Sequence, residues 1–497
     1  MKIAPLLFCI GLMTFQINAE EFLITEDALL DMAQAENPTL AEMEASFLAS
    51  KVQAEELKDK FGFEAYGGYN HLETNERAII SFQPVFSNIN QYTVGVKKYS
   101  KYGLVLDANT SVDQRSGASV AGSDYKDIHT TRMELGLQMD LWKDFWGRTT
   151  ARQLKNVEDQ KKKDELQLSI SKKTFQINVR KLYWALVANA EKIKINKRLI
   201  ATAGRQLKDA RRRRANSISD SAEVSRFESL VHQRNGQMLA LQYEKSVLEK
   251  NLKDLFPNLN SKEIKLSNYN IDKTILEVLT CSQAIGGTTN APLEHTSYDE
   301  VTKLLKGMQE RQYKVDQTYD DIDLKFDLKL AQVGVSSDTD NDTDFYGDFD
   351  SSLDDIREND RSAMSAGLML TIPFGEKRAE TTKVKEKLTE NKFKANIQNL
   401  ETQVVTTHSL TQNNVLILRD LVRAQRANSK ALNVRVREMR KKYNQARIPE
   451  YALIQDQDSL LQSDLGVIDT QLQMVNTILD YFTIFNSFPC SFNRGIK

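Results

Sequence analysis

Closely spaced aspartates are the first feature of the sequence that could do chemistry. Between 338 and 344 every second residue is Asp, the spacing with which a calcium-binding loop begins. Such a loop also needs Gly at its sixth position and Glu at its twelfth, where this chain has Thr343 and Phe349. We therefore expect a solvated acidic loop without a specific metal site. The only calcium candidates are Asp338, Asp340, Asp342 and Asp344.

Other groups that could serve catalysis or metal binding are scattered. The five histidines share no ligand-like spacing, and the chain has no P-loop, Gly-x-Ser-x-Gly turn or Cys-x-x-Cys pair. The formal net charge is -1, so no excess of basic residues points to nucleic acid. We expect no enzymatic activity, no cofactor and no nucleic-acid partner.

A short motif that occurs twice is more informative. Residues 218–224 match residues 448–454 at an offset of 230. Each copy places a helix-starting residue, Ser219 or Pro449, before an acidic residue that complements the helix dipole. We expect a tight helix-to-helix turn at each copy. Residues 135–141 likewise echo residues 366–372 at an offset of 231, so one unit is duplicated.

Alternation of apolar and polar residues predicts the strands. It is clear at 104–108, 133–141, 324–330 and 366–372. Each half then contributes two long strands, about four per chain. Residues 61–99 are also rich in β-forming residues, but their pattern does not place them.

Long helices fill the rest of each half. Residues 376–446 would form a helix of roughly 100 Å at 1.5 Å per residue. Two stripes with heptad spacing run along it and predict coiled-coil packing. The first stripe is Ile397, Val404, Thr411, Leu418, Gln425, Leu432 and Met439, and the second is Val415, Val422, Ser429, Val436 and Tyr443.

The N-terminus resembles a secretory signal. Lys2 precedes a short apolar run, and no later run of about 18 apolar residues predicts a transmembrane helix. Cys281 and Cys490 remain after cleavage, and whether they pair is open.

These patterns divide the chain. We expect a signal peptide at 1–19, a first structural repeat at 20–260, a linker at 261–295, a second structural repeat at 296–486 and a C-terminal tail at 487–497. Each repeat holds a helix, a β-hairpin region (61–142 or 323–373) and long helices (147–256 or 376–486).

A sheet of four strands cannot stand alone in lipid, because its edges leave backbone groups unpaired. The smallest bacterial barrels have eight strands, so several chains would have to close one barrel. The long helices would continue the cylinder away from the membrane. We therefore expect an α+β membrane protein, a tube with a β-barrel at one end and an α-helical coiled-coil barrel at the other.

The sequence resembles the TolC-like outer membrane efflux proteins. The resemblance is carried by residues 36–40, by 135–141 running on to Gly147 and Arg148, by 179–186, by 368–375 and by the paired turns. It identifies Gly147, Pro373 and Gly375 with the family's strand-to-helix junctions. No single motif is specific, but their order and duplication are.

The resemblance implies a homotrimer with a twelve-stranded barrel in the outer membrane lipid of a Gram-negative bacterium and a helical barrel in the periplasm. It implies a passive exit duct of a tripartite efflux pump or a type I secretion system. A periplasmic adaptor and an inner-membrane pump or ABC transporter would dock at the turns. The docking residues would be Ser217, Ile218, Ser219, Asp220, Glu223, Arg447, Ile448, Pro449, Glu450 and Leu453.

Basic residues lie just before both turns. They form either a solvated helix surface or salt bridges that hold the tip closed, with Arg213, Arg214, Arg440 and Lys442 as candidates. The aspartate pair that narrows the entrance in some family members falls here on Ala452 and Gln455, so cation block is not expected. Asp456 and Asp458 should face different directions on a helix.

Two other functions remain open. A periplasmic adaptor or coiled-coil scaffold without a pore would also contain long helices, although the matching strands in both halves argue against it. An exported enzyme has no motif in its favour.

Overall fold

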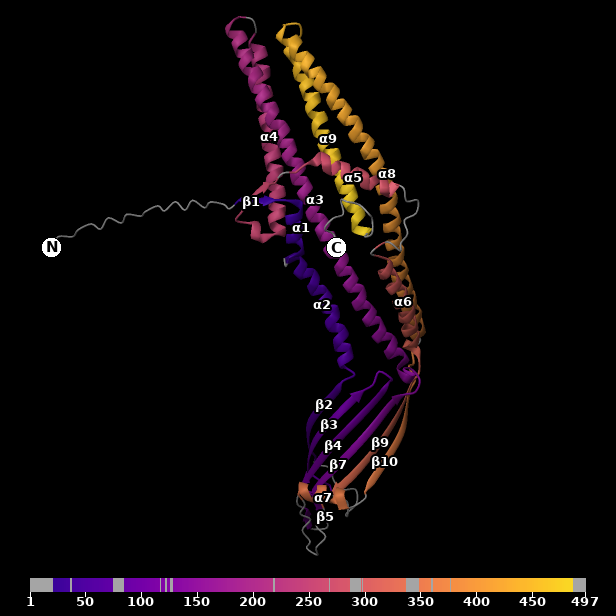
Figure 1. Cartoon of the computed structure of the whole chain (residues 1–497). Coiled ribbons are helices and arrows are strands. Elements are labelled where there is room, and N and C mark those ends of the chain that lie inside the picture. Colours follow the sequence, from indigo (N-terminus) through magenta and orange to yellow (C-terminus); the bar gives the residue numbers. More distant parts are fainter. Residues whose placement is uncertain are drawn as a thin grey trace, which may run out of the picture. The chain divides into compact units, whose positions relative to one another are not determined.

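The computed structural model describes residues 21–35, 38–74, 85–116, 118–120, 123–125, 128–217, 220–267, 269–286, 296, 298–336, 348–358, 361–375 and 377–485. The chain divides into two compact units (Figure 1). Unit 1 consists of Met1–Ala45, Leu166–Asp299 and Leu400–Lys497, and unit 2 of Ser46–Glu165 and Glu300–Asn399.

The repeat is present in the helices. Helix α3 (Arg148–Ala215) has 68 residues and its counterpart α8 (Arg378–Asn444) has 67. Helices α4 (Ser221–Leu255) and α9 (Glu450–Ile484) have 35 residues each. The expected long helices of both halves are confirmed.

The main strands form one six-stranded antiparallel sheet in unit 2. Its order is β10-β9-β7-β4-β3-β2 (Figure 1). The strands are β2 (Phe63–Glu73), β3 (Asn88–Tyr99), β4 (Leu104–Ser116), β7 (Ile128–Asp140), β9 (Asp323–Val335) and β10 (Ser362–Thr371). The short strands β5 (Ala118–Val120) and β6 (Ser123–Tyr125) pair with each other.

The expectation of two strands per half and about four per chain is wrong. The second half does contribute two, but the first contributes four, because residues 63–99 supply the hairpin β2–β3. Strand β2 does not show a clear alternation of apolar and polar residues. Tyr66 lies on the opposite face from Phe63 and Tyr69, and two glycines follow it.

Short helices flank the sheet. Helix α2 (Pro38–Asp59) begins in unit 1 and leads into β2, and α6 (Tyr298–Gln317) leads into β9. Helix α7 (Phe349–Glu358) packs on β7 and β9, where the hydroxyl oxygens of Thr131 and Ser352 are 2.6 Å apart. Gly334 allows this approach, because a Cβ there would lie 2.0 Å from the carbonyl oxygen of Ser352.

Unit 1 has its core around the middle of α3. Tyr183 and Trp184 are buried there, and the Trp184 indole N–H donates to the Glu26 carboxylate at 3.1 Å. The buried Arg180 guanidinium donates to the same carboxylate at 2.6 Å. Glu26 thus neutralises a charge that burial alone would make costly.

The segment 261–295, which we expected to be a linker, contains regular structure. Strand β8 (Glu263–Leu266) pairs in parallel with β1 (Glu21–Ile24), and α5 (Ile271–Gly286) follows. Helix α1 (Glu26–Gln34) and the single 3-10 turns Phe145–Gly147, Pro257–Leu259 and Thr318–Asp320 are the remaining elements of the described residues.

Both predicted stripes of α8 are packed. Val404, Thr411, Val415, Val422 and Tyr443 are buried, and the remaining members of the two stripes are half-buried. Among the polar members, Ser429 has a partner at the seam, since its hydroxyl donates to Asp464 of α9. The seam is a structural contact, as its heptad spacing predicted.

Several predicted features lie outside the described residues. They are the signal peptide, residues 36 and 37, Ile218, Ser219, the acidic segment 338–344 with its calcium candidates, and Cys490. Cys281 is disulfide-bonded. In the part of the chain that the structure describes, no helix is both long enough and apolar enough to cross a bilayer.

Candidate functional site

The sheet of unit 2 has one apolar face. Side chains alternate between the two faces of a strand, so the pairing register shows which residues share a face. One row of directly paired residues is apolar on all six strands. From β2 to β10 it is Ala65, Val96, Ala108, Leu135, Leu330 and Met364.

The next row, on the opposite face, is polar. It consists of Glu64, Lys97, Asp107, Gly136, Lys329 and Ser365. Its charges are paired along the sheet, with Lys97 Nζ 3.9 Å from Asp107 Oδ2 and Lys329 Nζ 3.1 Å from Glu134 Oε1. One face therefore suits an apolar environment and the other suits water.

Most of the apolar face is exposed, and α7 packs on it at Thr131 and Gly334, at one end of the sheet. Twelve of its large apolar side chains are exposed: Phe63, Tyr69, Tyr92, Val94, Val96, Leu106, Met133, Leu135, Leu330, Met364, Leu368 and Leu370. A soluble monomer rarely exposes so large a contiguous patch, which marks a surface that contacts a membrane or another protein.

Exposed aromatic residues border the sheet at the end that joins the helices. They lie at the start of β2, around the β3–β4 turn, after β7 and after β10. These are Phe63, Tyr99, Tyr102, Trp142, Phe145, Trp146 and Phe374. Aromatic side chains concentrate in this way where a membrane meets water.

The strand-to-helix junctions differ between the halves. Gly147, before α3, has a φ of +68°, and a Cβ there would lie 2.0 Å from the carbonyl oxygen of Lys101. Asp144 holds the same junction by accepting the backbone N–H groups of Thr149 and Thr150 at 2.7 and 3.0 Å. Near Gly375 no neighbouring atom lies within 4 Å of such a Cβ, so its junction is open.

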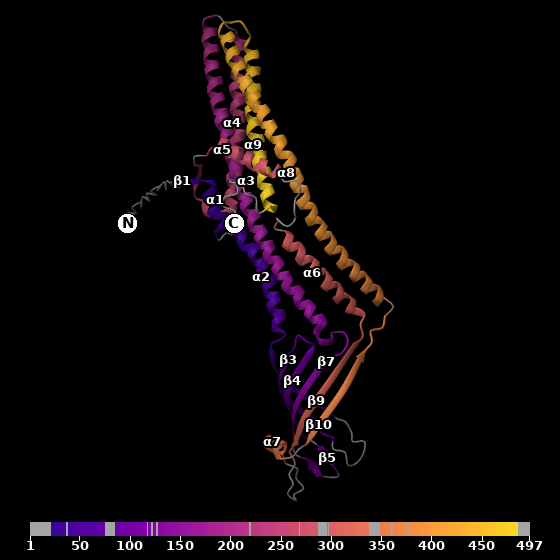
Figure 2. The same cartoon turned by 45° about the vertical axis from the view of Figure 1, so that its right-hand side comes forward.

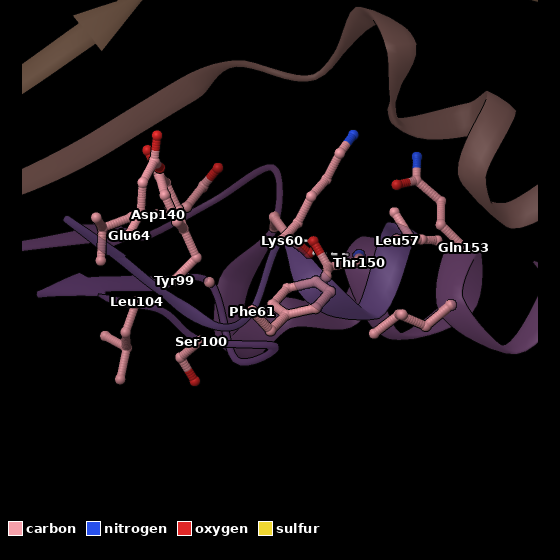
Figure 3. Close-up of a pocket in the computed structure, with 14 residues that line it drawn as sticks. Leu57, Lys60, Phe61, Glu64, Tyr99, Ser100, Leu104, Asp140, Thr150 and Gln153 are labelled. Carbon is pink, nitrogen blue, oxygen red and sulfur yellow. Dashed lines mark hydrogen bonds between the residues drawn. The ribbon is translucent and has the colours of Figure 1, made fainter. Parts of the chain in front are cut away.

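A pocket of about 600 Å³ lies beside the first junction (Figure 3). Leu57 comes from α2, Glu64 and Leu104 from strands, and Thr150 and Gln153 from α3. Neither His nor Cys is among its lining residues, so it lacks the imidazole or thiolate of a common catalytic pair. Among the described residues no cluster of His, Cys, Asp or Glu could hold a metal ion.

The paired turns lie at the same end of unit 1 (Figures 1 and 2). After α8, the N–H of Ala446 donates to Tyr443 and that of Arg447 to Lys442, both at 2.9 Å, which is a Schellman motif. Ala446 has φ 56° and Ser217, after α3, has φ 59°. The two copies thus share one turn geometry, held by residues other than glycine.

The helix starts after the turns use different caps. Asp220 caps α4 by accepting the Glu223 N–H at 2.7 Å, so the acid that we placed in the first turn is itself the N-cap. Pro449 is the N-cap residue of α9, with Glu450 as the first helical residue. The acidic residue required near each helix N-terminus is present in both copies.

An apolar cluster joins the four helices behind the turns. Phe227, Tyr443 and Leu453 belong to it, and Tyr443 also donates its hydroxyl to the Glu223 carboxylate. Arg213 lies 3.6 Å from Glu223 and 4.9 Å above the Tyr443 ring. Burial and then the Glu223 bond raise the pKa of Tyr443 to about 12, so the phenol stays protonated.

Two ion pairs link α4 to α9, and the sequence analysis missed both. Arg226 pairs with Glu450, and the buried Arg234 with Asp458. A signal existed: at the repeat offset of 230, these two arginines correspond to Asp456 and Asp464. The two arginines thus bridge the copies, whereas Asp456 and Asp464 contact Arg435 and Ser429 of α8, within their own half.

The remaining tip candidates divide by exposure. Leu453 is fully buried, so it joins the helices and is not accessible to a partner. Ser217, Asp220, Arg447 and Pro449 are exposed, and Ile448 is half-buried.

The basic candidates behave differently from one another. Arg213 faces Glu223, as described above. Arg214, Arg440 and Lys442 are exposed and form no ion pair with any described residue. For these three, the choice between a solvated helix surface and contacts at the tip stays a prediction.

Asp456 and Asp458 face different helices, as expected. Asp456 pairs with Arg435 of α8 at 2.9 Å, and Asp458 pairs with Arg234 of α4. Both carboxylates are thus engaged within the chain.

Solved structures of several bacterial membrane proteins resemble this chain. A membrane protein from Pseudomonas aeruginosa has a TM-score of 0.65 at 13% identity, with 93% of each chain covered. CusC, whose structures concern transmembrane channel formation, has 0.63 at 12% identity, with 94% of each chain covered. The outer membrane protein VceC from Vibrio cholerae has 0.62 at 12% identity, covering 92% of this chain and 95% of VceC.

The chain has the TolC-like fold. These similarities cover both units, so the architecture expected from the order and duplication of weak motifs is confirmed. No family model matches the chain, and no curated protein matches its sequence. The TolC-like fold describes the arrangement of helices and strands. The function of the sheet and of the turns has to be argued from the residues of this chain.

Proposed function

We propose that the protein is one subunit of an outer-membrane channel, with its sheet in the bilayer and its helices in the periplasm of a Gram-negative bacterium. The observation that carries this proposal is the two-faced sheet. An apolar row faces one side of all six strands and a charged row faces the other. In a transmembrane β-barrel, lipid-facing and lumen-facing residues alternate in this manner.

Strand length and the aromatic border support the same placement. The six strands have 10 to 13 residues, and a tilted strand needs about 9–11 to cross the hydrocarbon core. The border residues mark one membrane surface at the helix end of the sheet. Conduction then needs no catalytic group, and selectivity comes from the pore width and its lining charges.

Self-association into a homotrimer is part of the proposal. Two helices of unit 1 carry apolar stripes that nothing in the described chain covers. On α4 the stripe is Leu239, Tyr243 and Val247, and on α8 it includes Leu410, Ile417 and Leu421. Helices that expose apolar residues at such spacings bury them against another helix. Neighbouring copies would supply those helices.

The turns at the end of unit 1 are the proposed docking point for a periplasmic adaptor and an inner-membrane pump or secretion transporter. Ser217, Asp220, Arg447 and Pro449 are the exposed residues of that surface. The pairs Arg226–Glu450 and Arg234–Asp458 would hold the tip closed until the partner binds. The cargo follows from the identity of that partner.

A periplasmic scaffold without a pore is the competing function. It accounts for the helices and the docking turns, but it gives no role to an apolar sheet face bordered by aromatic residues. A scaffold would have to cover that face with another protein.

Membrane fractionation followed by planar-bilayer recording tests the proposal. The channel should fractionate with the outer membrane as a heat-modifiable oligomer and should conduct ions in a bilayer. A soluble periplasmic protein, or a membrane-bound oligomer without conductance, would contradict the proposal.

A further inference from the structure

The two halves reach the sheet by different routes. In the second half α6 ends at Gln317 and β9 begins at Asp323. In the first half α2 ends at Asp59, but β4, which corresponds to β9, begins only at Leu104. The hairpin β2–β3 fills this difference and has no counterpart in the second half. It is therefore an addition to the duplicated unit.

The added hairpin is fastened to the sheet across its inner strand. Tyr66 of β2 reaches over β3 and donates its hydroxyl to Asp107 of β4 at 2.8 Å. Gly95 of β3 makes this possible, since a Cβ there would lie 2.5 Å from the Tyr66 ring. Lys97 adds its amino group 4.6 Å above the same ring. An aromatic ring that covers a glycine of the neighbouring strand helps to fix the register of a β-sheet.

The hairpin also continues both faces of the sheet. Ala65 and Val96 extend the apolar row, while Glu64 and Lys97 extend the charged row. Had the hairpin been a solvated appendage, Tyr69, Tyr92 and Val94 would have no reason to lie on the same face as Leu135. The hairpin thus has one apolar and one charged face, like the other four strands.

The two edges of the sheet are suited to each other. Among the described residues, β2 pairs only with β3 and β10 only with β9, so each presents an open edge. Every neighbouring pair is antiparallel, and six is an even number, so β2 and β10 run in opposite directions. A second copy placed edge to edge therefore continues the antiparallel order. The strands also match in length, with 11 and 10 residues.

We propose that β2–β3 is a full part of the barrel wall, so that β10 of one copy pairs with β2 of the next and three copies close an eighteen-stranded barrel. This inference rests on the proposed channel function and on its trimer. It replaces the twelve strands that the resemblance implied. The partner that the open edge of β2 accepts is a second copy of this chain.

The consequence is a wider barrel. Barrel diameter grows roughly in proportion to strand number, so eighteen strands give an interior about one and a half times as wide as twelve. Barrels of 16–18 strands enclose an aqueous channel. The charged row with Lys97, Asp107 and Lys329 would line it. The sheet would then pass bulky polar cargo, and any narrow point would lie elsewhere in the conduit.

Cysteine cross-linking in the assembled membrane protein tests the seam. Ala366→Cys in β10 is combined in turn with Phe63→Cys, Ala65→Cys and Gly67→Cys in β2, which scans the register. Ala366→Cys combined with Ala108→Cys in β4 is the matched comparison. Val96→Cys with Ala108→Cys is the positive control, because these residues are directly paired within one chain. Each single variant controls for reaction with the native cysteines.

The expected result is a covalent oligomer of up to three chains from a β10–β2 pair, and none from the β10–β4 pair. Cross-linking through β4 with none through β2 would show that the hairpin lies outside the wall, which overturns the inference and leaves the channel function standing. Absence of the protein from the membrane, or of any oligomer there, would overturn both. A ring of two or four chains would overturn the eighteen-strand count.

Discussion

The two halves of the chain agree in their helices and differ in their strands. Helices α3 and α8 differ by one residue and α4 and α9 have equal length, yet among the described residues the first half contributes four strands to the six-stranded sheet and the second two. Helix length in a coiled-coil tube must match on all sides, because each heptad stripe packs against a neighbour. A sheet accepts strands in pairs, because a hairpin preserves the alternating directions.

The largest expected effect comes from placing a charge on the apolar face, once in the hairpin β2–β3 and once in the strands that both halves share. Val94→Lys lies in the added hairpin and Leu135→Lys in the shared part of the sheet. Each should destabilise the membrane-embedded protein by about 2–4 kcal/mol, since a lysine would face hydrocarbon. Denaturant unfolding in lipid vesicles measures both.

The control is Thr93→Lys, which lies on the charged face beside Val94 and should change stability little. An effect of Leu135→Lys without one of Val94→Lys would place the hairpin outside the membrane. Equal effects from Val94→Lys and Thr93→Lys would contradict the two-faced sheet.

Arg234→Ala tests the bridge between the two copies of the turn motif. Arg234 is buried, so its removal leaves the Asp458 carboxylate without its charged partner. The expected loss is about 1.5–3 kcal/mol, together with a larger conductance if the bridge holds the tip closed. Thermal melting and bilayer recording measure the two effects.

Arg440→Ala is the matched control, because Arg440 is exposed and makes no ion pair among the described residues. If both arginines behave alike, the α4–α9 bridge has no special part in the tip.

Tyr443→Phe removes the hydroxyl that donates to Glu223. We expect a loss of about 1–2 kcal/mol at neutral pH, because the carboxylate loses a charge-assisted bond. The folded pKa of about 12 exceeds the ordinary value of 10. The stabilisation is thus complete below pH 10 and disappears between pH 10 and 12.

The difference in melting temperature between the native protein and Tyr443→Phe, followed from pH 8 to 12, measures this contribution. It should shrink above pH 10. A difference that grows with pH would contradict the assignment of the proton to Tyr443.

Ala446→Gly has the smallest expected effect and the opposite sign. Ala446 has φ 56°, a left-handed conformation that costs an L-residue roughly 1 kcal/mol. Gly should therefore stabilise the turn by about that amount, as measured by melting. Ala424→Gly, in the exposed interior of α8, should destabilise by a similar amount and provides the contrast.

Much of this architecture could be predicted from the sequence. The alternation at 104–108 and 133–141 located β4 and β7, which pair in the sheet, and the heptads located the buried stripes of α8. These signals are local and periodic. Strand β2 was recognised as β-rich but could not be placed, because its contact of Tyr66 with Gly95 joins residues 29 positions apart and no local pattern records it.

The positions of the two helix-to-helix turns were predicted, but the contacts between their helices were not. The repeat located both turns, but the ion pairs of Arg226 and Arg234 connect residues 224 positions apart. Leu453 was expected to face a partner, whereas the fold buries it among the helices. Composition alone cannot separate a docking residue from one that packs inside its own chain.

The central claim is that one face of the sheet contacts lipid and the other lines water. Cysteine scanning along β3 from Gln91 to Lys97, in intact outer membranes, tests it most directly. A membrane-impermeant maleimide should label positions 91, 93 and 97, which share the charged face, and should not label 92, 94 and 96; Gly95 is left unchanged because Tyr66 covers it. Uniform labelling along β3, or the opposite alternation, would contradict the account.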